Sequence, residues 1–252
     1  MPILKTTFVG VDLSGGHNPF TFAAFDQDRQ LITLAGGEVE NLLALLGDHP
    51  VALVAVNAPP NPNHGLVRQS LEKQTPGHLR GADLRLAEHE LRQRGIHVSA
   101  TPARETFCPA WLQLGFSLHW ELAKMGFKPY PTKDAARQVM ETHPHAALYA
   151  LAGGQPLPKS TLEGRLQRQA ILFDKGLRIE DPTEFFEEIT RHKLMRGILP
   201  MELVYTPEEL DALIAAYIAY LAGTEPAALA AFGDKNEGQI YLPAGLNAIE
   251  PK

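Results

Sequence analysis

The chain is poor in cysteine and contains no long apolar run. Cys108 is its only cysteine among 252 residues, so no disulfide can form within the chain, and such scarcity is typical of a reducing cytosol. No apolar run approaches the roughly 18 residues that a membrane-spanning helix needs. The start, MPILKTTFVGVD, lacks the apolar core and cleavage site of a signal peptide. We therefore expect a cytoplasmic protein with no membrane partner, in an oligomeric state that the sequence does not fix.

Positive charge is also in short supply. The chain carries 23 Lys and Arg against 29 Asp and Glu, a formal net charge of −6, and a field of that sign does not attract nucleic acid to the molecule as a whole. Cations nevertheless gather within residues 78–104 and 159–178. Each cluster is interpreted either as a solvated helix face or as a local patch that binds nucleic acid.

The first third of the chain predicts three strands, a helix and a fourth strand. The expected elements are strands Thr7–Asp12, Thr21–Asp26 and Leu31–Ala35, helix Glu38–Leu46 and strand Val51–Val56. Short apolar runs joined by a polar turn indicate a hairpin, and a helical crossover places the fourth strand parallel to the first. We therefore expect Asp12 and Asn57 to be neighbours at the carboxyl ends of these strands, where open α/β sheets bind ligands.

The remainder is predicted to be mostly helical, within a single domain of residues 1–252. Residues of about 59–131 are interpreted as an elaboration after the fourth strand, because no linker-like composition surrounds them. The expected elements are helices Gly81–Arg94, Ala110–Met125, 144–153, Thr161–Lys175, Pro182–His192 and Pro207–Ala222, strands Ile96–Ala100 and Arg137–His143, and an extended segment at 238–245. The last helix is marked by a capping box from Thr206 to Glu209.

Three carboxylates fall where this arrangement would bury them. Asp12 ends the first strand, Glu141 closes the later one, and Asp211 flanks the apolar stripe of the last helix. A buried charge requires a partner, either hydrogen bonds, a cation or a metal. The alternatives are that Asp12 caps a turn, that Glu141 is exposed on an edge strand, and that Asp211 is an acidic residue favoured by the dipole of the helix start.

Taken together, these elements match the ribonuclease H-like arrangement. We expect an α/β fold with a mixed five-stranded sheet, built from a three-strand antiparallel meander plus parallel strands, flanked by helices and carrying a helical insertion after strand four. The chemistry of that arrangement needs clustered carboxylates, because Mg²⁺ is a hard cation with oxygen ligands. Two such ions activate a water and stabilise the leaving oxygen at a phosphodiester.

The sequence resembles a known family, the domain-of-unknown-function family 429, whose members are predicted ribonuclease H-like nucleases. The resemblance is carried by GVDLSGG (10–16), VNAPP (56–60), RGADLRLAEHELRQRGI (80–96), METHPHAALYALAGG (140–154), PKSTLEGRLQRQAIL (158–172), YTPEELDALIAAYIAYLAG (205–223) and GQIYLPAG (238–245). It implies that Asp12, Glu141 and Asp211 fall on the acidic positions of the family. It also implies that two polar motifs of the family contain Lys159, Gly164, Arg165 and Arg168, and Arg80, Asp83 and Arg85.

One position departs from the family, which usually has an acid where this chain has Asn57. Asparagine offers a carbonyl oxygen but no charge, so the hold on a metal ion is expected to be weaker. The first hypothesis is a nuclease with Mg²⁺ or Mn²⁺ on Asp12, Asn57, Glu141 and Asp211, a proton carrier at His143, and substrate contacts from Lys159, Arg165, Arg168, Arg80 and Arg85.

Two alternatives stay open. The fold could bind nucleic acid without cutting it, an interpretation that Asn57 favours. It could also be an ATP-dependent phosphotransferase, because VDLSGG superficially resembles a phosphate-binding turn; against this, only one such fold unit is predicted where those proteins have two.

Overall fold

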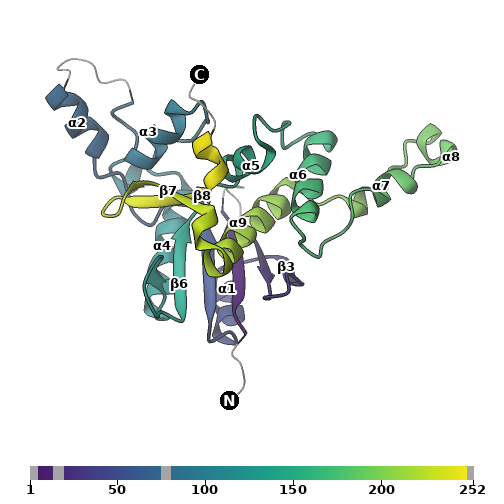
Figure 1. Ribbon diagram of the computed structural model, residues 1–252, viewed down its shortest axis with the longest axis horizontal. Helices are drawn as coiled ribbons and strands as arrows, with labels where there is room; N and C mark the ends of the chain where they lie inside the picture. The colour runs from purple at the N-terminus through teal and green to yellow at the C-terminus, as the bar shows by residue number, and fades with distance from the viewer. Residues whose placement is uncertain (1–4, 14–19, 75–80, 249–252) are drawn as a thin grey trace.

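The computed structural model describes residues 5–13, 20–74 and 81–248, which form one mixed sheet with helices on both faces (Figure 1). Its strands are β1 (Thr7–Asp12), β2 (Phe20–Phe25), β3 (Leu31–Gly37), β4 (Ala52–Val56), β5 (Lys128–Pro129), β6 (Arg137–Glu141), β7 (Leu229–Asp234) and β8 (Gly238–Pro243). Their order in the sheet is β3-β2-β1-β4-β6-β8-β7, with the short β5 paired to β6.

The helices range from single turns to the five-turn α9. The α-helices are α1 (Val39–Gly47), α2 (Leu66–Gln74), α3 (Leu86–Gln93), α4 (Ala110–Lys124), α5 (Pro144–Ala152), α6 (Leu162–Asp174), α7 (Glu184–Glu187), α8 (Arg191–Met195) and α9 (Pro207–Thr224). Short 3-10 turns are η1 (Glu105–Phe107), η2 (Met201–Leu203), η3 (Pro226–Ala228) and η4 (Ala244–Ala248). Among the described residues, no helix is both long and apolar enough to cross a bilayer.

The predicted meander and crossover are confirmed. β1 pairs antiparallel with β2 and parallel with β4, and β2 pairs antiparallel with β3. β4 then pairs in parallel with β6, and β6 with β8. The β1–β4 register places Val11 beside Val56, and the β4–β6 register places Val56 beside Glu141. The carboxyl ends of three parallel strands therefore share one edge of the sheet.

The sheet has eight strands, where the sequence predicted five. The additional ones are the short β5 and the β7–β8 hairpin, which extends the sheet beyond β6. Segment 238–245 was predicted to be extended, but its partner Leu229–Asp234 carries two alanines and a glycine and lacks the β-branched residues that usually mark a strand. Glu237 lies in the turn of this hairpin, fully buried, and accepts backbone N–H groups from His64 and Leu86. This turn thereby attaches the elaboration to the sheet.

Three other predicted elements differ in detail. Residues 96–100 form no strand, because the carbonyl of Val98 is occupied by the guanidinium of Arg92. The helix predicted over 81–94 begins only at Leu86. The helix predicted over 182–192 is split into α7 and α8, and Thr190 caps the second. The turn 14–16 and Arg80 lie outside the described residues.

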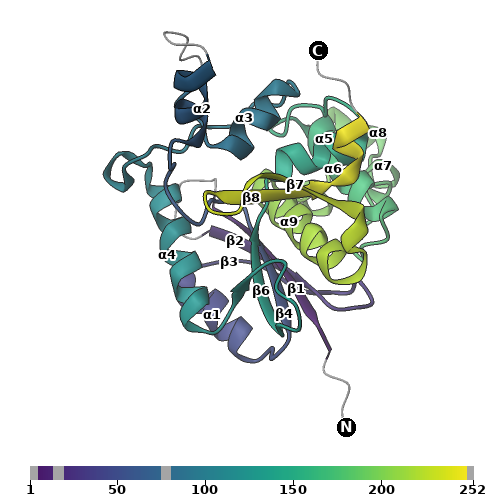
Figure 2. The ribbon, with the colours of Figure 1, turned by 60° about the vertical axis from the view of Figure 1, so that its left-hand side comes forward.

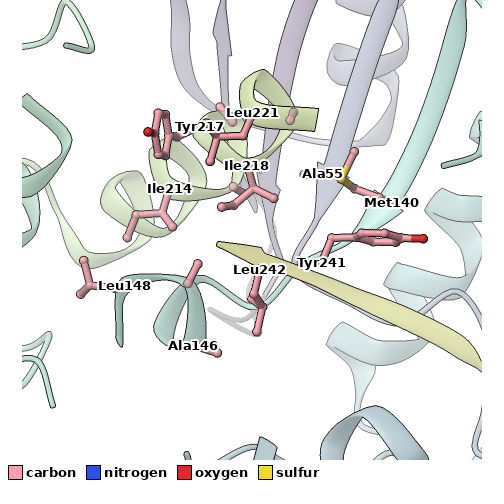
Figure 3. Close-up of a cluster of buried hydrophobic side chains, with 14 of the residues drawn as sticks. Ala55, Met140, Ala146, Leu148, Ile214, Tyr217, Ile218, Leu221, Tyr241 and Leu242 are labelled. Atoms are coloured by element: carbon pink, nitrogen blue, oxygen red, sulfur yellow. The ribbon is translucent and has the colours of Figure 1, made fainter. Parts of the chain in front are cut away.

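Helices cover the two faces of the sheet unequally (Figure 2). On one face, α9 packs on β1, β2 and β4 and is buried almost all round. Its residues Ile214 and Ile218 belong to the same buried cluster as Ala55 and Met140 (Figure 3). On the other face, α1 and α4 cover the alternate side chains of the same strands, including Val9 and Val54. Burial on both faces explains why β1 and β4 are continuous apolar runs.

The close approach of α9 to β1 depends on Gly10. A Cβ at this position would overlap the backbone of Ala212 and Ala216, so Gly10→Ala should lower the free energy of unfolding by about 3 kcal/mol or more. The matched control is Gly47→Ala in α1, where an added Cβ meets no atom within 4 Å. Urea unfolding monitored by circular dichroism measures both. Equal midpoints for the two variants would contradict the predicted packing.

Candidate functional site

A polar site lies at the shared carboxyl edge of β1, β4 and β6. Asp12 is the last residue of β1, Asn57 follows β4, and Glu141 is the last residue of β6. The backbone N–H of Asn57 continues the ladder to Val11 O at 2.9 Å. This alignment confirms the expected neighbourhood of Asp12 and Asn57, whose side chains meet through a hydrogen bond of 2.6 Å from Asn57 Nδ2 to Asp12 Oδ1.

Asp211 approaches the same edge from the second turn of α9. It is 5% exposed, because α9 lies flat on the sheet and its flanking residues are covered as well as its apolar stripe. Burial, and then the negative charge of Asp12, raise the pKa of Asp211 to about 6. Lys159 Nζ donates to Asp211 Oδ2 at 2.7 Å. Burial works against the charge of Lys159, but Asp211 and Asp12 hold its pKa above the ordinary value.

Glu141 is part of a separate buried ion network. Arg85 donates Nη1 and Nη2 to the two oxygens of Glu141, at 2.9 and 2.5 Å, and Nε to Glu88 at 2.8 Å. Glu88 also accepts the backbone N–H and the hydroxyl of Thr101. Burial raises the pKa of Glu141 against the opposing effect of Arg85. Both oxygens of Glu141 are therefore already committed to a guanidinium.

Most of these groups line a cavity of about 580 Å³, within the range of small-molecule sites. Asp12 is not among the lining residues. Of the residues predicted as site residues, those that line it are Asn57, Arg85, Glu141, His143, Lys159, Arg168 and Asp211. Sequence reasoning missed His97, His145, Trp111, Glu88 and Thr101. The pair His143-x-His145 was a visible signal, although its spacing is not that of a zinc site. Glu88 lies within the family segment 80–96, whereas His97, Thr101 and Trp111 lie in none of the quoted motifs.

The predicted cations have different environments. Arg165 donates Nε and Nη2 to the carbonyls of Tyr205 and Val204, both at 2.6 Å, and so ties α6 to the segment before α9. Arg168 is 1% exposed and reaches the cavity wall. Arg80 lies outside the described residues. Of the predicted phosphate contacts, Lys159, Arg168 and Arg85 line the cavity. The guanidinium of Arg85 is already bound by the carboxylates of Glu88 and Glu141.

His143 is fixed by the backbone of the helix that it starts. Its Nδ1 accepts the N–H of Ala146 at 3.2 Å as the N-cap of α5, and Pro144 follows at the first position. Burial, and then His145, lower the pKa of His143 to about 4. The ring is therefore neutral near pH 7 and carries its proton on Nε2, because Nδ1 is an acceptor.

A family model covers most of the chain. The match extends over residues 10–236 and is to DUF429, described as a protein of unknown function. The chain belongs to this family. No curated protein and no solved structure matches the chain. Membership of DUF429 therefore names the relatives of this protein without assigning an activity to the cavity.

The acidic residues only partly fit the predicted metal centre. Within residues 5–13, 20–74 and 81–248, no group of three or more His, Cys, Asp or Glu side chains is placed to hold a metal ion. Glu141 is bound by Arg85 at both oxygens, and Asn57 brings no charge. Asp12 and Asp211 remain as neighbouring carboxylates. The residues do not fit a two-ion centre, but they fit a single Mg²⁺, which takes one or two carboxylates and keeps several waters.

The Arg85 network is predicted to be structural. Arg85→Gln removes the cation between Glu88 and Glu141 and leaves two buried carboxylates unpaired, so we expect a loss of about 3–5 kcal/mol in unfolding free energy. The control is Lys124→Gln, which breaks the exposed pair with Glu121 and should cost less than about 1 kcal/mol. Urea denaturation compares them. An unchanged midpoint for Arg85→Gln would show that its charge is not needed for folding.

His143 should make stability fall in mild acid. A histidine whose pKa is lowered in the folded state contributes stability that is present above about pH 6.5 and is lost as pH falls towards 4. His143→Asn keeps an N-cap acceptor but cannot titrate, so its loss of stability between pH 7 and pH 5 should be smaller than that of the wild type by about 2 kcal/mol. Denaturant unfolding at both pH values measures this, with the exposed His192→Asn as control. Identical pH slopes in wild type and His143→Asn would refute it.

Proposed function

We propose that this DUF429 protein is a divalent-metal-dependent nuclease that hydrolyses phosphodiester bonds and uses a single ion. The observation that carries the proposal is the pair of buried carboxylates from β1 and α9: Asp211 lines a cavity together with Lys159 and Arg168, and Asp12 lies close enough behind it for its charge to raise the pKa of Asp211. Like charges are placed together in a protein interior when a cation compensates them.

The topology supports a ribonuclease H-like assignment. The order β3-β2-β1-β4-β6, with β2 antiparallel to the others, is the order expected of that fold. β8 and β7 then extend the far edge, and α9 supplies an acid opposite β1. In this arrangement the acids lie at the carboxyl ends of parallel strands, where α/β sheets bind their ligands.

The residues of the chain have separate roles in this proposal. Asp12 and Asp211 would hold Mg²⁺ or Mn²⁺, and Asn57 fixes the orientation of the Asp12 carboxylate through its 2.6 Å hydrogen bond. A bound divalent ion supplies an activated water and stabilises developing negative charge on oxygen. Lys159, with its side chain 44% exposed, is long enough to turn from Asp211 towards a phosphate of the substrate. Glu141 holds the wall of the cavity through Arg85 and is not a ligand.

A second candidate is supported by the ion pair between Lys159 and Asp211. The ammonium group already compensates the carboxylate at 2.7 Å, and Asn57 stands where relatives are expected to have an acid. A protein with this arrangement could bind nucleic acid without cleaving it, since its cavity wall still offers cations to phosphates.

Cleavage assays separate the two candidates. The full-length chain is incubated with end-labelled single strands, duplexes and RNA–DNA hybrids in Mn²⁺, Mg²⁺ or EDTA. We expect metal-dependent cleavage that falls on the order of 100-fold or more in Asp12→Asn and Asp211→Asn, with Asp48→Asn, at the exposed end of α1, unchanged. Circular dichroism confirms that each variant folds.

The outcomes are distinct. Cleavage that survives in both Asp12→Asn and Asp211→Asn would overturn the proposed site. Binding of a nucleic acid without cleavage of any substrate would favour the second candidate, a binding protein, over the nuclease. The salt dependence of the binding affinity would then give the number of phosphates contacted.

A further inference from the structure

Arg168 is a buried cation that pairs with no carboxylate in the part of the chain that the structure describes. Its side chain is 1% exposed, and none of the ion pairs formed by the described residues includes it. Nη1 donates to the carbonyls of Leu157 and Gly164 at 2.9 and 2.8 Å, and Nε has no hydrogen-bond partner among the described residues. A buried, incompletely bonded guanidinium is costly. An anion that bound the free N–H group and compensated the charge would offset this free-energy cost.

The surroundings of Arg168 favour an anion. Arg168, His97, His145 and Lys159 all line the cavity. They are also close enough for their charges to interact, since Arg168, Lys159 and His97 each disfavour a proton on His145. The acid whose charge acts on Arg168 is Asp211, and the carboxylate of Asp211 is already bound by Lys159. The lining therefore includes two cationic side chains and two imidazoles, all of which can donate N–H groups to an anion.

The wall at this point is held rigidly. Residues 155–159 line the cavity, and Arg168 fastens them through Leu157 O. At the start of α6, a Cβ on Gly164 would overlap the carbonyl of Pro158, so only glycine lets the helix approach this segment. The donors are consequently in place before a ligand arrives, which reduces the entropy lost on binding.

We infer that this part of the cavity is a subsite for a terminal phosphate group, bound by Arg168 with His145 and His97. The depth of Arg168 decides between phosphate types: an internal phosphodiester needs room for chain on both sides, whereas a phosphate monoester at a chain end needs one path. The monoester also carries more negative charge for a guanidinium to compensate. The inference rests on the proposed function for its choice of nucleic acid, and it specifies the substrate as a phosphorylated end.

Binding measured without metal tests the subsite independently of cleavage. Single-stranded octamers with a 5′-phosphate, a 3′-phosphate or two hydroxyl ends are labelled at an internal position and titrated with the full chain in EDTA, read by fluorescence anisotropy. We expect one phosphorylated form to bind about tenfold tighter than the unphosphorylated form, corresponding to about 1.4 kcal/mol. Inorganic phosphate and a nucleoside monophosphate, added as competitors, should remove this advantage, and the stronger of the two shows whether the base contributes.

Variants locate the phosphate. The advantage should disappear in Arg168→Gln and fall at least threefold in His145→Ala, a partly exposed position that tests the subsite even if Arg168→Gln does not fold. The exposed Arg191→Gln on α8, far from the sheet in Figure 1, is the matched control and should bind as the wild type does.

Equal affinity for all three octamers, no binding at all, or a phosphate advantage that persists in His145→Ala and in a folded Arg168→Gln would each overturn the inference. Cleavage in Mn²⁺ without any preference for a phosphorylated end would refute the subsite but not the nuclease proposal. A preference for a phosphorylated end without cleavage would refute the nuclease proposal but not the subsite.

Discussion

Four buried carboxylates impose the main electrostatic constraint on this structure, and three of them, Glu88, Glu141 and Asp211, line one cavity. Asp12, Glu88, Glu141 and Asp211 are each 5% exposed or less. The free-energy cost of an unpaired charge in that environment would be too high for a stable fold. The protein compensates them in two groups. Arg85 forms ion pairs with Glu88 and Glu141. Lys159 pairs with Asp211, and the side-chain amide of Asn57 donates a hydrogen bond to Asp12. The arrangement of strands and helices around the cavity is what makes both groups possible.

The two groups differ in how firmly the cation is held by its carboxylate partners. Arg85 is itself buried, makes a two-pronged contact with Glu141, and is enclosed by Thr101 and the start of α3. Lys159, by contrast, is a single point of contact on a half-exposed side chain. A compact ammonium on a flexible stem is readily exchanged for another cation, whereas a planar guanidinium in a fitted pair is not. The proposed cation site is therefore placed at Asp12 and Asp211, and Glu141 is assigned a structural role.

The sequence predicted the centre of the fold better than its margins. Apolar runs at β1 and β4, the helix between them and the capping box of α9 carry local signals, and the parallel pairing of β4 with β1 then follows from the helical crossover. The same reasoning predicted that Asp12 and Asn57 are neighbours. The β7–β8 hairpin was missed because Leu229–Asp234 acquires its strand conformation from its partner and from burial under α3, not from its own composition.

The sequence predicted that three acids are buried, but it did not predict their partners. Asp12, Glu141 and Asp211 are buried as expected, yet no local pattern reveals that Arg85, 56 residues before Glu141, takes both of its oxygens. Arg165 and Arg168 are three residues apart on α6, and only the coordinates show that the first binds backbone carbonyls of 204–205 while the second reaches the cavity. The sequence shows which side chains are charged. Which partner each charged side chain binds depends on distances that the whole fold sets.

The result is a cavity with two electrostatic halves. In one part, Asp211 is paired with Lys159 and the charge of Asp12 acts on both. In another, Arg168 and two histidines have no carboxylate within ion-pair distance among the described residues. Arg168 could have been neutralised by a nearby acid, as Arg85 is, but the protein leaves it facing the cavity. Since charge separation within a few side chains costs energy in a low-dielectric site, it is maintained where a ligand of matching polarity completes it. A phosphorylated substrate with a cation at its reacting phosphate has that polarity, and this connects the chemistry proposed at Asp12 and Asp211 with the anion subsite proposed at Arg168.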